Sequence, residues 1–147
     1  MINLKEKRAQ NKIRLSNEDA CYAYVVSGHS QRSTQHMGCG VKVGQTYDYE
    51  KRFNQLNKTG RITRHCVFCC ENRADAEWLE ATLRRHFLNL KSSKRNGTDW
   101  IENVATKEYK LEQIIKDPCV KYVLDEINPI YVITSKRGYA DDIFPWK

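Results

Sequence analysis

This 147-residue chain has no long apolar run, no internal repeat and no low-complexity tract. No stretch approaches the roughly 20 apolar residues of a membrane-spanning helix, so we expect no membrane association. The first 20 residues also lack the apolar segment of a secretory signal. Proline is scarce, and all three prolines lie at or after position 118. These absences predict one compact domain in the cytoplasm.

The six cysteines do not require disulfide bonds in a chain of this size. Cys21, Cys66 and Cys119 lie in apolar runs, which is typical of reduced, buried thiols. A zinc site built from His65 and the sequence CVFC is the weaker interpretation, since side chains diverge along a strand and a structural zinc ion needs four convergent ligands.

The net charge of +7 is unevenly distributed. Residues up to Thr98 contain 18 Lys/Arg against 9 Asp/Glu, whereas the remainder contains 7 against 9. Each of the windows 1–15, 51–64 and 84–97 holds five Lys/Arg. The three windows together contain one acid, Glu6. Clustered cations of this kind favour binding to a phosphate backbone, because neutralised phosphates release condensed counterions. The alternative is a solvated cationic surface.

Apolar periodicity predicts strands over 20–28, 41–44 and 62–70 and a helix after Asp48. A long helix over 74–90 carries an apolar stripe from Ala76 to Leu90. The expected fold is therefore α+β, with a small, mostly antiparallel three-stranded sheet flanked by helices. We divide the chain into a basic arm (1–20), a core (21–102) and an extension packed on the core (103–147).

The extension is predicted to begin with a helix from Thr106 to Lys116, ended by Pro118. A further strand is expected over 128–135, and residues 138–147 are interpreted as a tail.

This order of elements, with the residues on them, resembles the GIY-YIG nuclease superfamily. CYAY ends in Tyr24 where the family has its first motif, and KVG at 42–44 stands at the second. Arg52 matches the arginine of the following helix and Glu80 the glutamate of the long helix. The second motif and the ending GTDWI are most similar to the phage-type branch. Tyr22, Lys42 and Asn57 depart from the usual motif residues.

The resemblance implies a metal-dependent endonuclease that hydrolyses phosphodiester bonds in DNA. Tyr24 would be the base, Lys42 the cation that favours its phenolate, and Arg52 the clamp on the scissile phosphate. Glu80 would hold Mg²⁺ or Mn²⁺, with Glu77 as the fallback ligand. The residues alone also allow structural roles. Tyr24 could simply pack, Arg52 could form an ion pair on the helix surface, and Glu80 could form an ion pair with Arg84.

DNA is the expected partner, with RNA as an open alternative, and a phage-encoded protein would act in the bacterial cytoplasm. Cutting both strands from one active site would require a homodimer or two binding events. The side chains expected to contact nucleic acid are Tyr22, Arg32, Lys51, Lys58, Arg61, Arg84, Lys91, Lys94 and Arg95.

Two other functions compete with a nuclease. One is a non-catalytic nucleic-acid-binding protein of the same fold. The other is a phage regulatory or anti-defence protein that acts on a protein partner of unknown identity.

Overall fold

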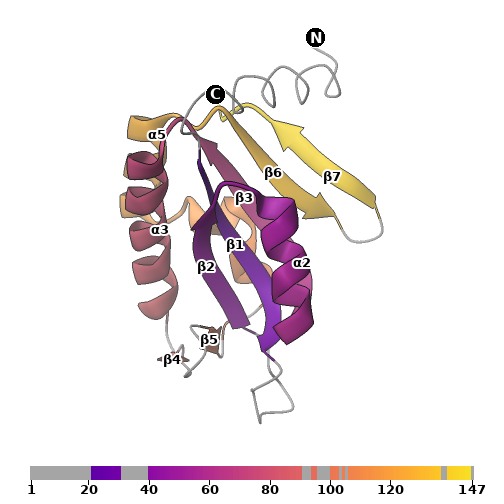
Figure 1. The fold of residues 1–147 in the computed structure, drawn as a ribbon. Helices are drawn as coiled ribbons and strands as arrows, with labels where there is room; N and C mark the ends of the chain where they lie inside the picture. Colours follow the sequence, from indigo (N-terminus) through magenta and orange to yellow (C-terminus); the bar gives the residue numbers. More distant parts are fainter. Residues whose placement is uncertain are drawn as a thin grey trace.

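The computed structural model describes residues 21–30, 40–90, 94–95, 100–102, 104, 106–136 and 139–146. Within these ranges the chain forms one antiparallel sheet of seven strands, in the order β4-β5-β2-β1-β3-β6-β7, with helices on both faces (Figure 1). The strands are β1 (Cys21–Ser30), β2 (Gly40–Thr46), β3 (Gly60–Cys70), β4 (Lys94–Arg95), β5 (Ile101–Glu102), β6 (Tyr131–Lys136) and β7 (Tyr139–Phe144). The helices are α2 (Tyr49–Thr59), α3 (Arg73–Leu88), η1 (Thr106–Tyr109), α4 (Leu111–Ile114) and α5 (Pro118–Ile127).

The predicted α+β class is confirmed, and the three expected strands form the centre of the sheet as β2, β1 and β3. The sheet is wider than the three strands expected. Val67, Phe68 and Cys69 of β3 are fully buried, so this strand is covered on both faces. β6 pairs with the edge of β3 that β1 leaves open, and Ile130 N donates a 2.8 Å hydrogen bond to Cys69 O at its start.

Each face of the sheet has its own apolar core. α3 and α5 cover one face, where Ala23, Val25, Val41 and Phe68 point, and α2 covers the other (Figure 1). The residues that fill the face beneath α2 are mainly aromatic and β-branched: Tyr22, Tyr24, Val26, Leu56, Val67, Tyr131 and Ile133. The α2 face is the one on which the candidate site lies.

The long helix α3 follows its predicted stripe. Ala76, Leu79, Leu83 and Phe87 are all fully buried against the sheet. The helix begins at its N-cap Asn72, whose side chain accepts a 2.8 Å hydrogen bond from Asp75 N. It ends at Leu88, so Leu90 lies just beyond it and is partly buried.

The predicted C-terminal elements need three corrections. The single helix expected from Thr106 to Lys116 is divided into η1 (Thr106–Tyr109) and α4 (Leu111–Ile114). Pro118 does not only end a helix: it is the first residue of α5, which has Asp117 as its N-cap. Proline is well tolerated at that position because its missing N–H would have no helical partner. The expected tail contains β7, which pairs with β6.

Two further predictions concerned the N-terminal arm and the absence of a membrane-spanning helix. The predicted basic arm, residues 1–20, lies outside the described residues. In the part that is described, no helix has both the length and the apolar character to cross a membrane.

Candidate active site

Tyr24 lies at the centre of the site, on the sheet face that α2 covers. Its partner across the β1–β2 ladder is Gly44. A Cβ atom at Gly44 would stand 2.5 Å from ring carbon Cζ of Tyr24, closer than real Cβ atoms come to any neighbour. Glycine at position 44 is therefore required by the ring that lies over it.

Arg52 reaches Tyr24 from α2. Its Nε donates a hydrogen bond of 3.3 Å to the Tyr24 hydroxyl, and its Nη1 donates one of 3.3 Å to Oε1 of Gln55. No carboxylate among the described residues forms an ion pair with Arg52. This distinguishes it from the surface arginine of the alternative interpretation and leaves further guanidinium donors for an oxyanion.

The start of α2 fixes where Arg52 lies. As predicted, Asp48 caps the helix: its Oδ1 accepts a 3.1 Å hydrogen bond from Lys51 N, and its carbonyl accepts one of 3.1 Å from Arg52 N. Phe53 then points inward, with its ring 5.5 Å from that of Tyr24 in an edge-to-face contact. The adjacent Arg52 consequently sits at the rim of this packed face, half-buried.

Lys42 shares the face but is not the cation bonded to the tyrosine. It pairs with Val26 in the β1–β2 ladder, which makes it a diagonal neighbour of Tyr24, and only 9% of its surface is exposed. Diagonal neighbours in an antiparallel pair lie about 7–8 Å apart. Arg52 contacts the hydroxyl directly, so the predicted role of Lys42 stays a prediction.

Glu80 approaches from the other side of the sheet, on α3. Its Oε1 lies 2.7 Å from Nη2 of Arg84, the ion pair that the helical spacing allowed. The same Arg84 nitrogen donates a 3.0 Å hydrogen bond to Val43 O. The Glu80 side chain is 15% exposed, whereas the fallback ligand Glu77 is 50% exposed and paired with Arg73 at 2.9 Å.

Arg84 and Tyr24 contact neighbouring residues of β2, Val43 and Gly44, from opposite sides of the sheet. β5 pairs with Gly40 and Val41 alone, so no described strand covers the outer edge of β2 from Lys42 to Thr46. Figure 1 shows β2 between α3 and α2. The Val43 carbonyl that Arg84 holds precedes Gly44, over which Tyr24 lies. One dipeptide thus connects Glu80 and Arg84 with Tyr24 and Arg52.

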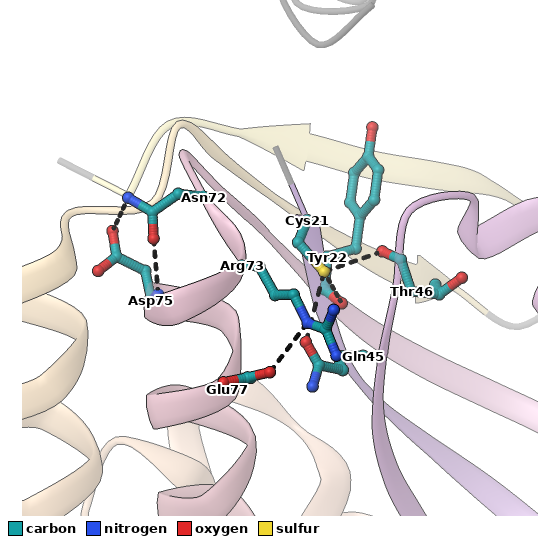
Figure 2. Close-up of polar contacts among 8 residues, drawn as sticks. All are labelled: Cys21, Tyr22, Gln45, Thr46, Asn72, Arg73, Asp75 and Glu77. Atoms are coloured by element: carbon teal, nitrogen blue, oxygen red, sulfur yellow. Dashed lines mark hydrogen bonds and ion pairs between the residues drawn. The ribbon is translucent and has the colours of Figure 1, made fainter. Parts of the chain in front are cut away.

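A polar corner lies near the end of β2, at the beginning of β1. Figure 2 shows the Cys21 thiol directed at Thr46, whose carbonyl it reaches at 3.5 Å, and the thiol also lies 3.6 Å from Oε1 of Gln45. Burial raises the pKa of Cys21, so this thiol is a packing group rather than a nucleophile.

The predicted nucleic-acid contacts fall into different settings. Lys51 and Lys58 are exposed on α2. Tyr22 is buried, and its hydroxyl is hydrogen-bonded to that of Tyr131 at 3.0 Å. Arg84 is 32% exposed and is engaged with Glu80 and Val43.

The backbone alone is described for three of the predicted contacts. Arg61 lies in β3, while Lys94 and Arg95 form β4, two strands away from β2. Arg32 and Lys91 lie outside the described residues.

Two polar pairs were not predicted from the sequence. His65 Nε2 lies 3.2 Å from Asp141 Oδ2, and the His65 ring contacts Phe53 with centroids 5.0 Å apart. The second pair is Tyr22 with Tyr131, where burial raises the pKa of both hydroxyls. Neither pair leaves a local pattern, since each joins strands far apart in the chain.

The zinc alternative meets a geometric obstacle. Cys66 packs in the core beneath α3 and Cys69 in the core beneath α2, so the two thiols of CVFC lie on opposite faces of β3.

Glu80 is the residue that would hold a divalent ion. Within the described ranges there is no cluster of three or more His, Cys, Asp or Glu side chains. Mg²⁺ is often bound through only one or two carboxylates, with waters and substrate phosphates as its other ligands. A single carboxylate near a strand edge that no described strand pairs fits that mode, in which the phosphate itself is a ligand.

Comparison with known proteins gives one match. No curated protein and no solved structure matches the chain significantly. Residues 21–120 match the T5orf172 domain, a phage-associated, nuclease-related domain, in agreement with the nuclease-type character predicted from the motifs. Because this match covers about two thirds of the sequence, the chain belongs to the T5orf172 domain family.

Proposed function

We propose that the protein is a metal-dependent endonuclease of GIY-YIG type that hydrolyses phosphodiester bonds in DNA. One observation carries the proposal: the guanidinium of Arg52 is bonded to the Tyr24 hydroxyl, which lies over a glycine of β2 in a stretch that no described strand pairs on its outer edge. Buried tyrosines need only one partner for their hydroxyl. An arginine in that position, which forms no ion pair with any described carboxylate, adds a phosphate-binding fork.

Arg52 would bind the scissile phosphate through donors that Tyr24 and Gln55 leave unused. Its positive charge would also stabilise negative charge on the Tyr24 oxygen, so that the tyrosine accepts a proton from the attacking water. As the phosphate gains charge in the transition state, the same guanidinium stabilises it. Lys42, on the same sheet face, would add a second positive charge.

Glu80 would hold the metal ion. When bound, such an ion polarises the phosphate and neutralises the leaving oxygen. Arg84, ion-paired with Glu80 and bonded to Val43, would keep the carboxylate directed at the β2 edge. Arg84 is therefore proposed as a positioning residue.

Incubation of supercoiled plasmid with the full-length protein and Mg²⁺ tests the proposal. We expect nicked DNA that EDTA prevents and that is lost in Glu80→Ala. The matched control is Glu77→Ala, which removes an exposed carboxylate from the same helix and should cut normally. Cleavage that survives Glu80→Ala would refute the assignment of the metal ligand.

A nucleic-acid-binding protein without activity is the second candidate. Tyr24 is only 1% exposed and Glu80 already has an ion-pair partner, an arrangement that a purely structural role also explains. Duplex binding without cleavage in Mg²⁺ or Mn²⁺ would favour this candidate over the nuclease.

A further inference from the structure

The outward face of α2 is a compact polar surface. Lys51, Asn54, Gln55 and Lys58 follow a spacing of three, one and three residues, which puts them on one side of a helix. All four side chains are exposed, while Phe53 and Leu56 face the sheet. We call these four residues the α2 outer face.

The cations of the α2 outer face have no ion-pair partner among the described residues. Within the described part of the chain, the side chains of Lys51, Asn54 and Lys58 form no hydrogen bond or ion pair. Two other helix cations are paired with an acid one turn away: Arg73 with Glu77 and Lys121 with Asp125, each at 2.9 Å. Lys51 and Lys58 therefore present positive charge that no described acid binds in an ion pair, although the exposed Glu50 lies in the first turn of the same helix.

We propose that the α2 outer face enters the major groove of duplex DNA, where Asn54 and Gln55 contact base edges and Lys51 and Lys58 contact flanking phosphates. Asparagine and glutamine amides match the paired donor and acceptor of adenine in that groove, and the groove of B-form DNA is wide enough for a helix. The major groove of duplex RNA is too deep and narrow for such readout. This inference rests on the proposed function in requiring a DNA substrate.

Gln55 links base contact to the proposed clamp. Its Oε1 accepts a hydrogen bond from Arg52 Nη1, and Arg52 Nε donates to Tyr24. An amide oxygen has two lone pairs, so Oε1 can accept from Arg52 and from adenine together, while the amide nitrogen donates to the base. A correctly bound base would then help to hold the Arg52 guanidinium in place.

Binding of a randomised duplex library to full-length protein in EDTA, without cleavage, tests the inference. We expect the unmodified protein to select adenine at one or two positions. Asn54→Ala/Gln55→Ala should lose about 5- to 100-fold of that discrimination. Lys51→Ala/Lys58→Ala should instead weaken binding to every sequence and lower the slope of log K against log salt by about 2.

The control for the lysines is Lys110→Ala/Lys116→Ala, which removes the same charge from exposed positions outside α2 and should bind normally. An unchanged sequence preference in the amide variant would overturn the inference, as would an unchanged salt slope in the Lys51/Lys58 variant. Tighter binding to single strands or duplex RNA than to duplex DNA would also overturn it. Failure of the nuclease proposal looks different: α2-dependent duplex binding would persist, with no cleavage when Mg²⁺ is added.

Discussion

Arg52 Nε and the Tyr24 hydroxyl are 3.3 Å apart, so α2 and β1 share a polar contact at the edge of an otherwise apolar interface. Twenty-eight residues separate the two along the chain. Their contact depends on the cap at Asp48, which sets the register of α2, and on Gly44, which makes room for the ring.

Replacing Arg52 should abolish cleavage without unfolding the protein. Arg52→Ala removes the fork, and loss of a donor that stabilises transition-state charge typically costs about 100- to 1000-fold in rate. Arg52→Lys should restore little, because an ammonium cannot donate in the paired geometry of a guanidinium. Plasmid nicking rates measure the effect, with thermal unfolding as the check on folding. Full activity of Arg52→Lys would show that charge alone suffices.

Gly44→Ala should destabilise the fold through a clash with the Tyr24 ring. Overpacking of a tight site costs about 1–3 kcal/mol, which chemical denaturation can resolve. In the Tyr24→Ala background, Gly44→Ala should destabilise the fold less, because the Tyr24 ring is absent. A double-mutant cycle therefore isolates the contact between the two residues. Equal costs in the two backgrounds would mean that the ring moves aside readily.

Lys42→Met should reduce cleavage at least about tenfold if the buried lysine assists Tyr24, a size typical of a nearby stabilising charge. Methionine keeps much of the side-chain length, so the variant changes charge more than packing. Lys116→Met, at an exposed position outside α2, is the matched control for removal of a lysine charge. Rates that match those of the unmodified protein across the pH range would return Lys42 to a structural role.

Asp117 should make stability depend on pH on the acid side. Burial alone would raise the pKa of Asp117, but hydrogen bonds from His86 and from the Cys119 and Val120 backbone lower it below its ordinary value of 3.8. A carboxylate with a depressed folded-state pKa stabilises the fold above its unfolded pKa, and this contribution is lost as the pH falls through the folded value. Acidification below about pH 4 should therefore remove it.

Asp117→Asn isolates that contribution, since asparagine still caps α5. We expect the variant to be less stable than the unmodified protein at neutral pH, and the gap to close as the pH is lowered towards about 2. Denaturant titrations at several pH values give the comparison. A gap that stays constant with pH would show that the carboxylate charge is not responsible.

The sequence correctly predicted the helices and strands that are determined by residues close together in the chain. The stripe of α3, the cap of α2 and the apolar runs of β1, β2 and β3 each follow from neighbouring residues. β7 was not predicted, because an edge strand forms only where a neighbouring strand has unpaired backbone groups. Here that neighbouring strand is β6. α5 was missed because Pro118 can end one helix or begin the next, and the Asp117 cap that decides between them was overlooked.

The sequence could predict which strand or helix carries each site residue, but not which side chains contact each other. Tyr24, Arg52 and Glu80 lie on the strand and helices expected for them. The sequence could not show that Glu80 lies on the opposite side of the sheet from Tyr24, or that Arg52 rather than Lys42 bonds the tyrosine hydroxyl. Both depend on which face each helix covers, which is a property of the packed sheet rather than of any segment.

The pairing of β6 with β3 has a consequence for synthesis on the ribosome. β3 ends at Cys70, but its partner begins only at Tyr131, beyond the end of the matched family region at residue 120. Until β6 has emerged, the growing chain holds an apolar strand with one row of backbone groups unpaired, and such edges promote association between chains. A fragment that stops at residue 120 should therefore aggregate during expression even though it contains every proposed catalytic residue.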